Sequence, residues 1–418
     1  MSETAEQSKF FLEKVHLKGY KSIEDLSIDL KDGMNILIGK NGSGKSNFLE
    51  FLNKALLSVY KEQDFIFKSA ELSFIQGNDV TLYAIEKLNK RITSSEGAEI
   101  LRFPINKKLT INSELVYDNL RDEVRSENII YNERGIRAGK SLRTTFNLMR
   151  VSLFPMYIEY NLPQYFMSGG DSASVIISDT DWEMWEISNG TNLINVVIDE
   201  IENNLINEFG EAFYEDGELE GEDRAAKLRK FLFDKITKSV MLEKLVVKQE
   251  IIDNLSQFSP IKAVRFNENI NIYKDDKRIT IENLKLEYLV NDNWIPWSYL
   301  SDGTKRIFYI ITSVISKKNG LILIEEPELG IHPHQFELLM QFLKEQSQYK
   351  QFIISTHSPK TLDHLNENEL DNILVASYEK EKGTVLTRLS EEQQLKAKDY
   401  MKEVGYLSDY WLMSDLEA

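Results

Sequence analysis

The amino-acid sequence predicts an α/β fold whose sheet is buried on both faces. A glycine-rich segment, GKNGSGKS at residues 39–46, follows one short apolar run and precedes a helical pattern. A second apolar run at residues 321–324 ends in two acidic residues, and another helical pattern begins near Pro333. Short apolar runs that alternate with amphipathic helices are typical of strands covered by helices on both sides. These observations predict a strand, loop and helix unit of the kind that binds phosphate.

The composition limits the classes of protein to consider. The chain has 418 residues, with 67 acidic against 50 basic side chains and a formal charge of -17. An average surface of this charge repels phosphate backbones, so nucleic acid would need a local basic patch. With no cysteine, a disulfide scaffold and a cysteine nucleophile are excluded. No apolar run approaches the ~18–20 residues of a membrane helix, and the N-terminus lacks a signal-peptide pattern. We expect a cytoplasmic protein without a membrane partner.

The N-terminal part is expected to contain several strands and one helix. Turn-prone residues separate apolar runs at residues 11–17, 26–30 and 34–38, which predict three strands. From Lys45 to Val59 the apolar positions repeat with helical spacing. Further strand candidates lie at residues 80–85, 109–115 and 128–131.

The middle and C-terminal parts differ in character. Amphipathic patterns predict helices at residues 193–206 and within 225–255, and the acidic stretch 211–223 between them is expected to be a solvated loop. Strand patterns return at 261–266, 269–273, 279–281 and 285–290. A helix after Leu300, the strand 321–324, a helix from Pro333, a strand at 351–354, and finally two strands and a helix complete the chain. We therefore expect a discontinuous head, residues 1–138 and 259–418, and a mainly helical insertion, residues 139–258.

The glycine-rich segment fills the pattern G-x-x-x-x-G-K-[ST] in the expected strand and helix context. Its glycines allow successive backbone N–H groups to point inward and cradle phosphate. The Lys45 ammonium can reach the outer phosphates, and the Ser46 hydroxyl can ligate Mg²⁺. The nucleotide-binding candidates of this segment are Gly39, Lys40, Asn41, Gly42, Ser43, Gly44, Lys45, Ser46 and Asn47.

Three further positions suit nucleotide chemistry. Glu325 and Glu326 emerge at the end of a buried strand, where Glu325 can hold Mg²⁺ and Glu326 can act as general base toward water. Ser301 and Gly303 precede a helix whose N-terminus can receive an anion. His357 follows the next strand and can bond a γ-phosphate. The competing interpretations are an accidental glycine turn, a solvated strand end and a structural histidine, and the context of each motif favours the functional one.

Five motifs in this order resemble the ABC-type ATPase heads of the SMC and RecF kind, and more closely the stand-alone ATPases grouped with the overcoming-lysogenization-defect (OLD) family. They are LKGYKSI (17–23), GKNGSGKSN (39–47), LSDGTKR (300–306), ILIEEPELGIHP (322–333) and STHSP (355–359). The resemblance implies a P-loop NTPase, an ABC-type two-lobed ATPase head with a helical insertion. It implies ATP and Mg²⁺, a nucleotide-binding Lys21, a switch role for His357, and a homodimer or higher homo-oligomer in which Ser301 and Gly303 cover the ATP of another copy.

The sequence departs from the resembled pattern at three places. Glutamate stands at Glu325 where aspartate is usual, which moves the charge by one methylene. Asp302 stands where transporters have glycine, as is typical of the resembled soluble group. A Q-loop cannot be placed, and Gln76 is the nearest candidate.

Three functions are compatible with these motifs. OLD proteins carry a C-terminal TOPRIM nuclease with an Asp-x-Asp pair, but the stretch after His357 is too short for one, and Asp179 and Asp181 are expected to be loop acids. The favoured hypothesis is a regulatory ATPase of bacterial anti-phage defence, similar to the ATPase subunits of Septu and PARIS, that pairs with a separately encoded effector. The alternatives are a RecF-like or SMC-like DNA-repair ATPase acting as an ATP-gated clamp and, least favoured, a transporter subunit. The basic residues Arg134, Arg137, Lys140, Arg143 and Arg150 are either a solvated loop or a nucleic-acid contact.

Overall fold

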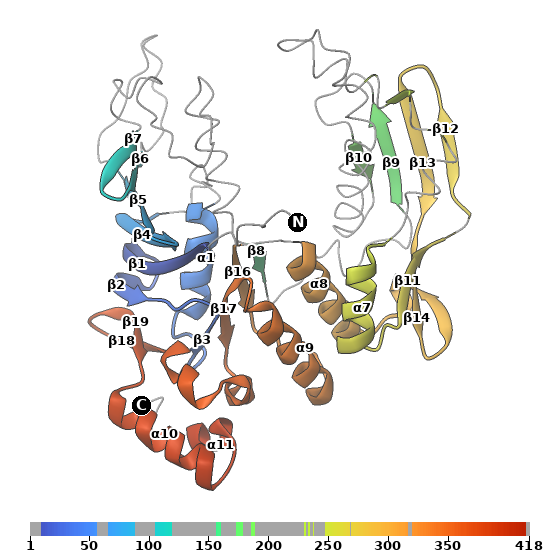
Figure 1. Cartoon of the computed structure of the whole chain (residues 1–418). Coiled ribbons are helices and arrows are strands. Elements are labelled where there is room, and N and C mark those ends of the chain that lie inside the picture. The colour runs from blue at the N-terminus through green and yellow to red at the C-terminus, as the bar shows by residue number, and fades with distance from the viewer. Residues whose placement is uncertain are drawn as a thin grey trace, which may run out of the picture. The chain divides into compact units, whose positions relative to one another are not determined.

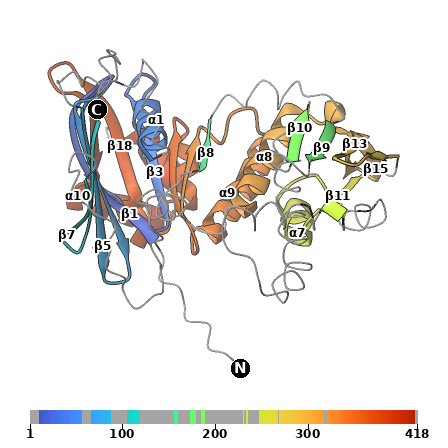
Figure 2. The same cartoon turned by 90° about the horizontal axis from the view of Figure 1, so that it is seen from above.

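The computed structural model describes residues 10–56, 66–87, 105–118, 156–159, 173–178, 185–188, 230, 233–234, 237, 247–267, 269–316 and 320–414 (Figure 1, Figure 2). The chain divides into two compact units. The first comprises Met1–Tyr160, Lys317–Leu329 and Leu343–Ala418, and the second comprises Asn161–Ser316 and Gly330–Phe342. Each unit is described by itself.

A large mixed sheet forms the centre of the first unit. Within the described residues it has 12 strands in the order β7-β6-β5-β4-β1-β2-β19-β18-β3-β17-β16-β8. Their bounds are β1 Phe10–Tyr20, β2 Ile23–Asp29, β3 Met34–Ile38, β4 Ser69–Gln76, β5 Asp79–Lys87, β6 Ile105–Ile111, β7 Glu114–Asp118, β8 Met156–Ile158, β16 Leu321–Glu325, β17 Gln351–Thr356, β18 Ile373–Glu379 and β19 Gly383–Arg388.

One half of this sheet is parallel. β3 lies between β17 and β18, β16 lies between β17 and β8, and all four pairings are parallel. Every residue of β3, β16 and β17 is buried, which explains why these strands are apolar runs rather than alternating patterns. The C-terminal ends of β3, β16 and β17 therefore meet at one edge of the sheet.

The helix α1, Lys45–Leu56, packs its apolar side against this sheet. Its buried positions include Phe48, Leu49, Leu52 and Ala55, which recur with the spacing of one helical face. Phe51 contacts the rings of Tyr20 and Phe67 edge-on at centroid distances of 5.2 and 5.7 Å. The core of the first unit thus joins the helix after the glycine-rich loop to the antiparallel strands.

The C-terminal segment of the first unit adds two 3-10 helices and two α-helices. They are η2 Pro359–His364, η3 Glu367–Asn372, α10 Glu391–Glu403 and α11 Leu407–Met413. Ser408 at the start of α11 donates from its backbone N and its hydroxyl to Asp363 of η2, at 2.8 Å each. These bonds fix α11 against η2.

The second unit contains two small sheets and several helices within its described residues. Its strands are β9 Ala173–Ser178, β10 Trp185–Ser188, β11 Ala263–Phe266, β12 Asn271–Lys274, β13 Arg278–Leu284, β14 Leu286–Val290 and β15 Asn293–Pro296. They pair in the orders β10-β9-β13-β12 and β11-β14-β15. The helices are α7 Gln249–Phe258, η1 Trp297–Tyr299 and α8 Asp302–Ser316, and α9 Pro333–Gln346 runs from the second unit into the first. Tyr288, Trp297 and Phe308 pack ring to ring at centroid distances of 5.1–5.6 Å.

The observed elements agree with most sequence expectations and differ at several places. The run at residues 109–115 is a hairpin rather than one strand, because Asn112 and Ser113 have φ values of 49 and 69° and turn the chain between β6 and β7. β4 was not expected, although its alternating buried residues Ala70, Leu72 and Phe74 are a strand pattern. The expected strand at 128–131 and helix at 193–206 lie outside the described residues.

The expected mainly helical insertion, residues 139–258, contains three strands in its described part. β8 pairs with β16 in the large sheet, and β10 pairs with β9, which also pairs with β13. Short strands such as β8 give little local signal because their stability comes from the neighbouring strand. The expected domain boundary at residue 139 therefore differs from the division in the structure, where β8 belongs to the first unit.

Candidate nucleotide-binding site

The glycine-rich loop connects β3 to α1. Gly42 and Gly44 have φ values of 81 and 96°, a left-handed conformation that glycine adopts without a Cβ clash. Ser43 N donates to Lys40 O at 3.2 Å, and Phe48 N donates to Gly44 O at 3.1 Å. In the part of the chain that the structure describes, the buried Ser43 hydroxyl has no hydrogen-bond partner. A loop that leaves a buried hydroxyl for another molecule fits a bound phosphate.

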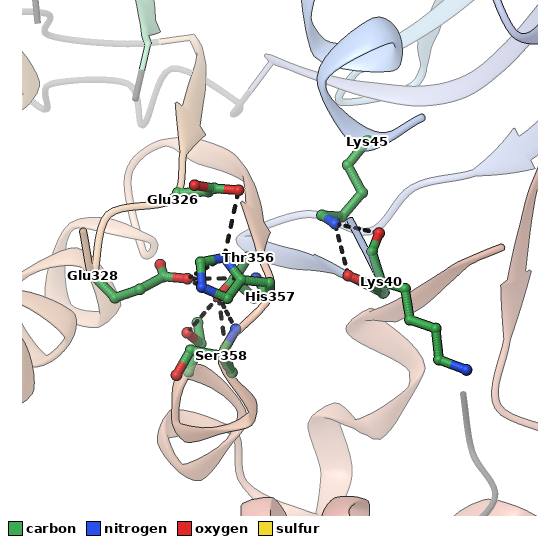
Figure 3. Close-up of polar contacts among 9 residues, drawn as sticks. Lys40, Lys45, Glu326, Glu328, Thr356, His357 and Ser358 are labelled. Carbon is green, nitrogen blue, oxygen red and sulfur yellow. Dashed lines mark hydrogen bonds and ion pairs between the residues drawn. The ribbon is translucent and has the colours of Figure 1, made fainter. Parts of the chain in front are cut away.

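Lys45 lies across this loop (Figure 3). Its side chain is buried, and Nζ donates to the carbonyl oxygens of Gly39 at 2.7 Å and Lys40 at 3.1 Å. The Lys40 side chain extends away from Lys45 and is exposed (Figure 3). Lys40 therefore contributes to the loop through its backbone, whereas Lys45 contributes its ammonium charge.

The C-terminal strands β18 and β19 hold the loop from outside. A Cβ on Gly39 would collide with the carbonyl of Ala376, and a Cβ on Gly44 would lie 2.8 Å from Thr384 Cγ2. Ser22 Oγ lies 2.7 Å from Thr384 Oγ1 and accepts from Asn47 Nδ2 at 2.7 Å. Close packing thus requires glycine at both positions, and the left-handed φ of 96° adds a second reason at Gly44.

Lys21 lies beside the helix that follows the loop. It has a φ of 48°, and its ammonium donates to Glu50 of α1. Glu50 also pairs with Lys54 at 2.9 Å. Partial burial acts to raise the pKa of Glu50, but the bonds from Lys21 and Lys54 outweigh it and lower this pKa below its usual value. The structure therefore places Lys21 one helical turn from Ser46, on the Glu50 carboxylate.

Glu325 ends β16 and is 2% exposed. The pKa of Tyr157 of β8 is raised, by burial first and then by the nearby Glu325 charge. Burial followed by the charges of Glu325 and Glu50 also raises the pKa of Glu159, which follows β8. Sequence reasoning missed Tyr157 and Glu159. The sequence pattern that could have identified them is a carboxylate, Glu159, directly after the apolar run MYI, which is the same pattern that identified Glu325.

The donors Ser46 and Glu325 suit magnesium. α1 packs against β16, and both side chains offer the oxygen ligands that Mg²⁺ prefers. Among the described residues no group of three His, Cys, Asp or Glu side chains could hold a metal by itself. A magnesium ion here would thus take few protein ligands and complete its shell with phosphate and water, as is usual in phosphoryl-transfer sites.

Glu326 and His357 lie together at the ends of β16 and β17 (Figure 3). Glu326 has a φ of 43°, and its backbone N donates to Ser355 O at 2.8 Å. His357 Nδ1 is 3.4 Å from Glu326 Oε1. A left-handed non-glycine residue at a strand end is a conformation found at functional sites. The glutamate and the histidine expected to serve one reaction are therefore neighbours.

Ser301 and Gly303 lie at the N-terminus of α8 in the second unit. Thr304 N donates to Ser301 Oγ at 3.2 Å, so Ser301 caps the helix. A Cβ on Gly303 would lie 2.5 Å from Gly330 O, which explains the glycine. Asp302 is exposed and pairs with the buried Lys305 at 3.6 Å. The N-terminus of α8 thus begins at an exposed residue, Ser301. A helix end of this kind can receive an anion.

The structure brings some predicted residues together and leaves others apart. Lys45, Glu325, Glu326 and His357 follow neighbouring parallel strands. The Q-loop candidate Gln76 ends β4, which β1, β2, β19 and β18 separate from β3 in the sheet, so it does not lie beside β16. The basic residues 134–150, and Asp179 and Asp181, fall outside the described residues.

A mixed sheet whose parallel half carries a glycine-rich loop, a buried carboxylate and a strand-end histidine defines a P-loop ATPase class. The chain belongs to the family described as "AAA domain, putative AbiEii toxin, Type IV TA system", whose model matches residues 34–165 and 199–363. ATP binding is a property of this class. None of the helices in the described part of the chain has the length and hydrophobicity of a membrane-spanning segment.

The chain is also similar to individual proteins and to solved structures. The Retron Vc95 probable ATPase of Vibrio cholerae serotype O1 biovar El Tor is 22% identical over 416 residues, 90% of this chain and 76% of that protein. Endonuclease GajA of Bacillus cereus (strain VD045) is 38% identical over 96 residues, 22% of this chain and 16% of that protein. A crystal structure of the SmcHead bound to the C-winged helix domain of ScpA has a TM-score of 0.50 and 16% identity, covering 92% of this chain and 99% of that chain. The fold is therefore that of an SMC-like head.

Proposed function

We propose that this chain binds and hydrolyses ATP with Mg²⁺ and controls a separately encoded effector in anti-phage defence. The main support for ATPase activity is that β3, β17 and β16 are neighbours and end on the same side of the sheet. The candidate residues lie at or just after the ends of these strands: Lys45, Glu325, Glu326 and His357. Lys45 binds the outer phosphates. Ser46 and Glu325 would hold the magnesium ion, which neutralises phosphate charge when it is bound.

Glu326 acts as the general base. The oxygen of a water molecule bonds to the γ-phosphorus, the bond from that phosphorus to the bridging oxygen breaks, and the water proton passes to the Glu326 carboxylate. The products are ADP and phosphate. Lys21 and the backbone N–H groups of residues 39–47 orient the nucleotide, and His357 contacts the γ-phosphate.

A second copy completes the site in this proposal. Ser301 and Gly303 form a helix end suited to an anion, and they belong to a different unit from the loop. In heads of the resembled kind such a helix covers the ATP of another copy, so two copies would share two nucleotides. The SMC-like fold supports this arrangement.

Mixing two inactive variants tests whether the site is shared. Lys45→Ala removes the phosphate contact and Ser301→Arg blocks the helix end, so each chain alone should be inactive. Mixed, they should recover up to about a quarter of the unmodified ATPase activity if they assemble at random, because one composite site per mixed dimer is intact. Gln257→Arg, an exposed change on α7, is the control and should be fully active. Absence of activity in every mixture would refute the shared site.

The defence role is supported by the similarity to a retron ATPase across most of both chains. Expressed with its neighbouring genes, the unmodified protein should lower phage plating, and Glu326→Gln should abolish this protection while the protein still accumulates. Equal plating for both would contradict a defence role that depends on hydrolysis, without affecting the ATPase proposal.

The second candidate is an ATP-gated DNA clamp, favoured by the SMC-like head fold and by the basic residues 134–150. Changing Arg134, Arg137, Lys140 and Arg143 to Glu should then weaken DNA binding and flatten its salt dependence, by a slope of about 0.9 for each lost phosphate contact. Filter binding across salt concentrations measures this. Weak binding by the unmodified protein at physiological salt would favour the defence role.

A further inference from the structure

Glu328 lies two residues beyond Glu326 and faces the same histidine (Figure 3). Its side chain is 13% exposed. Oε1 accepts from the Thr356 hydroxyl at 2.6 Å and from His357 N at 3.4 Å. Thr356 is fully buried at the end of β17, so the Glu328 carboxylate is fixed in position against the strand that carries the histidine.

His357 Nδ1 stands between two carboxylates. It lies 3.4 Å from Glu326 Oε1 and 3.6 Å from Glu328 Oε1. Both distances exceed the roughly 2.9–3.0 Å of a normal N–H···O bond. Because a carboxylate only accepts and Nδ1 carries at most one hydrogen, a full bond to either glutamate is made at the expense of the other.

Glu328 has acceptor capacity to take that hydrogen. Its Oε1 faces the ring at 3.6 Å, and across the described residues its buried Oε2 has no hydrogen-bond partner, so the carboxylate as a whole accepts fewer bonds than it can. His357 is 44% exposed and has room to move, whereas Glu328 is held by Thr356. A ring movement of roughly half an ångström would make a bond of normal length with one of the two carboxylates.

We propose that Glu328 is a positioning residue that withdraws the His357 Nδ1–H from Glu326. While His357 bonds Glu326, that carboxylate is occupied and is a poorer acceptor for the proton of the attacking water. Transfer of the bond to Glu328 releases Glu326 Oε1 from the imidazole and fixes the ring so that its other nitrogen faces outward. The inference rests on the proposed ATPase and names the residue that controls its base.

A double-mutant cycle in the full-length protein tests the inference. Glu328→Gln keeps the shape but weakens the acceptor, so kcat should fall by about tenfold, a fraction of the ~10²–10⁴-fold effect of a general base, while KM for ATP stays within about twofold. In a His357→Ala background the same change should alter kcat by less than about twofold, because no imidazole then competes for Glu326. Glu328→Asp should retain part of the activity, and Glu379→Gln on the exposed β18–β19 hairpin is the matched control. Equal fold losses in both backgrounds would overturn the proposal.

A spectroscopic measurement keeps the test decisive even where His357→Ala has too little activity to measure. Protein labelled with ¹³C and ¹⁵N in its five histidines gives the imidazole signals, and His357→Ala assigns the relevant one. Glu328→Gln should shift the Nδ1 signal of His357 and leave the other four unchanged. An unchanged His357 signal would overturn the proposal. If the unmodified protein has no ATPase activity the proposed function fails, whereas an active protein with an additive cycle refutes only the role of Glu328.

Discussion

Adding one methyl group to the glycine-rich loop should destabilise the sheet, by an amount that depends on which glycine carries it. Gly42 and Gly44 both have left-handed φ values, 81 and 96°, so alanine costs about 1–2 kcal/mol in backbone strain at either position. A Cβ on Gly42 meets nothing within 4 Å, whereas a Cβ on Gly44 would collide with Thr384 Oγ1 and lie 2.8 Å from Thr384 Cγ2 and 2.9 Å from Ser22 Oγ. Carbon atoms normally approach to about 3.5–4.0 Å.

The clash at Gly44 cannot be relieved by a simple rotation of Thr384. Thr384 is fully buried, its hydroxyl lies 2.7 Å from Ser22 Oγ, and its backbone N donates to Ser22 O at 2.7 Å. Overpacking of this kind costs about 1–3 kcal/mol. Gly44→Ala should therefore cost about 2–5 kcal/mol against about 1–2 kcal/mol for Gly42→Ala.

Amide hydrogen exchange without nucleotide is the suitable assay, because a chain with two units need not unfold in one step. Exchange of the peptide that contains β3 should accelerate about tenfold for each 1.4 kcal/mol lost. In Gly44→Ala combined with Thr384→Ala the loss should be about 1–3 kcal/mol smaller than the sum of the two single losses. Equal protection in the two glycine variants, or additive losses in the double variant, would refute the packing argument.

Three further predictions concern charges in the site. Lys45→Ala should abolish ATP binding in isothermal titration, because its ammonium is the expected partner of the outer phosphates, while Lys40→Ala, which keeps the backbone carbonyl, should bind; unchanged affinity in Lys45→Ala would contradict the assignment. Glu326→Gln should bind ATP without turnover and accumulate an ATP-dependent dimer in light scattering, whereas one mass with and without ATP would point to a permanent oligomer or an unshared site. The pKa of Glu50 is lowered, so its ion pairs stabilise the fold above the ordinary pKa of 4.5 and lose this contribution as pH falls through the lower pKa of the folded state. In urea titrations, Glu50→Gln should thus lower the free energy of unfolding by about 0.5–1 kcal/mol at pH 7 and by progressively less below about pH 4. A difference between the two proteins that stays constant with pH would show that the ion pairs are not responsible.

Local patterns predicted the strands and helices that carry the site. β3, β16 and β17 are short apolar runs because both faces of the sheet are covered. The glycine-rich motif predicts the conformation of the loop directly. Parallel pairing also explains why the glycine-rich loop, Glu326 and His357 all follow strands that end on the same side of the sheet. These features depend on residues that are close together in the chain, so they can be predicted from the sequence.

Other parts of the site depend on residues far apart in the chain. β8 is three residues long and is a strand only because it pairs with β16, and Tyr157 and Glu159 enter the site with it. Thr384 packs on Gly44 from the other end of the chain, and neither residue indicates the other. Glu328 was visible as part of the motif around Glu326, but its contact with His357 requires the turn after β16 and the end of β17 to be placed together.

The position of β3 has a consequence for the order in which the protein is made. β3 is synthesised early, yet its two sheet neighbours are β17 and β18, and β17 begins roughly 310 residues after β3 ends. At ~5–20 residues per second, the ribosome needs about 15–60 s to deliver the first of these partners. Throughout that interval β3, an apolar strand that is buried in the folded protein, has no strand paired on either side, a state that favours aggregation. The sheet that supports the glycine-rich loop is therefore complete only after the C-terminal strands have been synthesised.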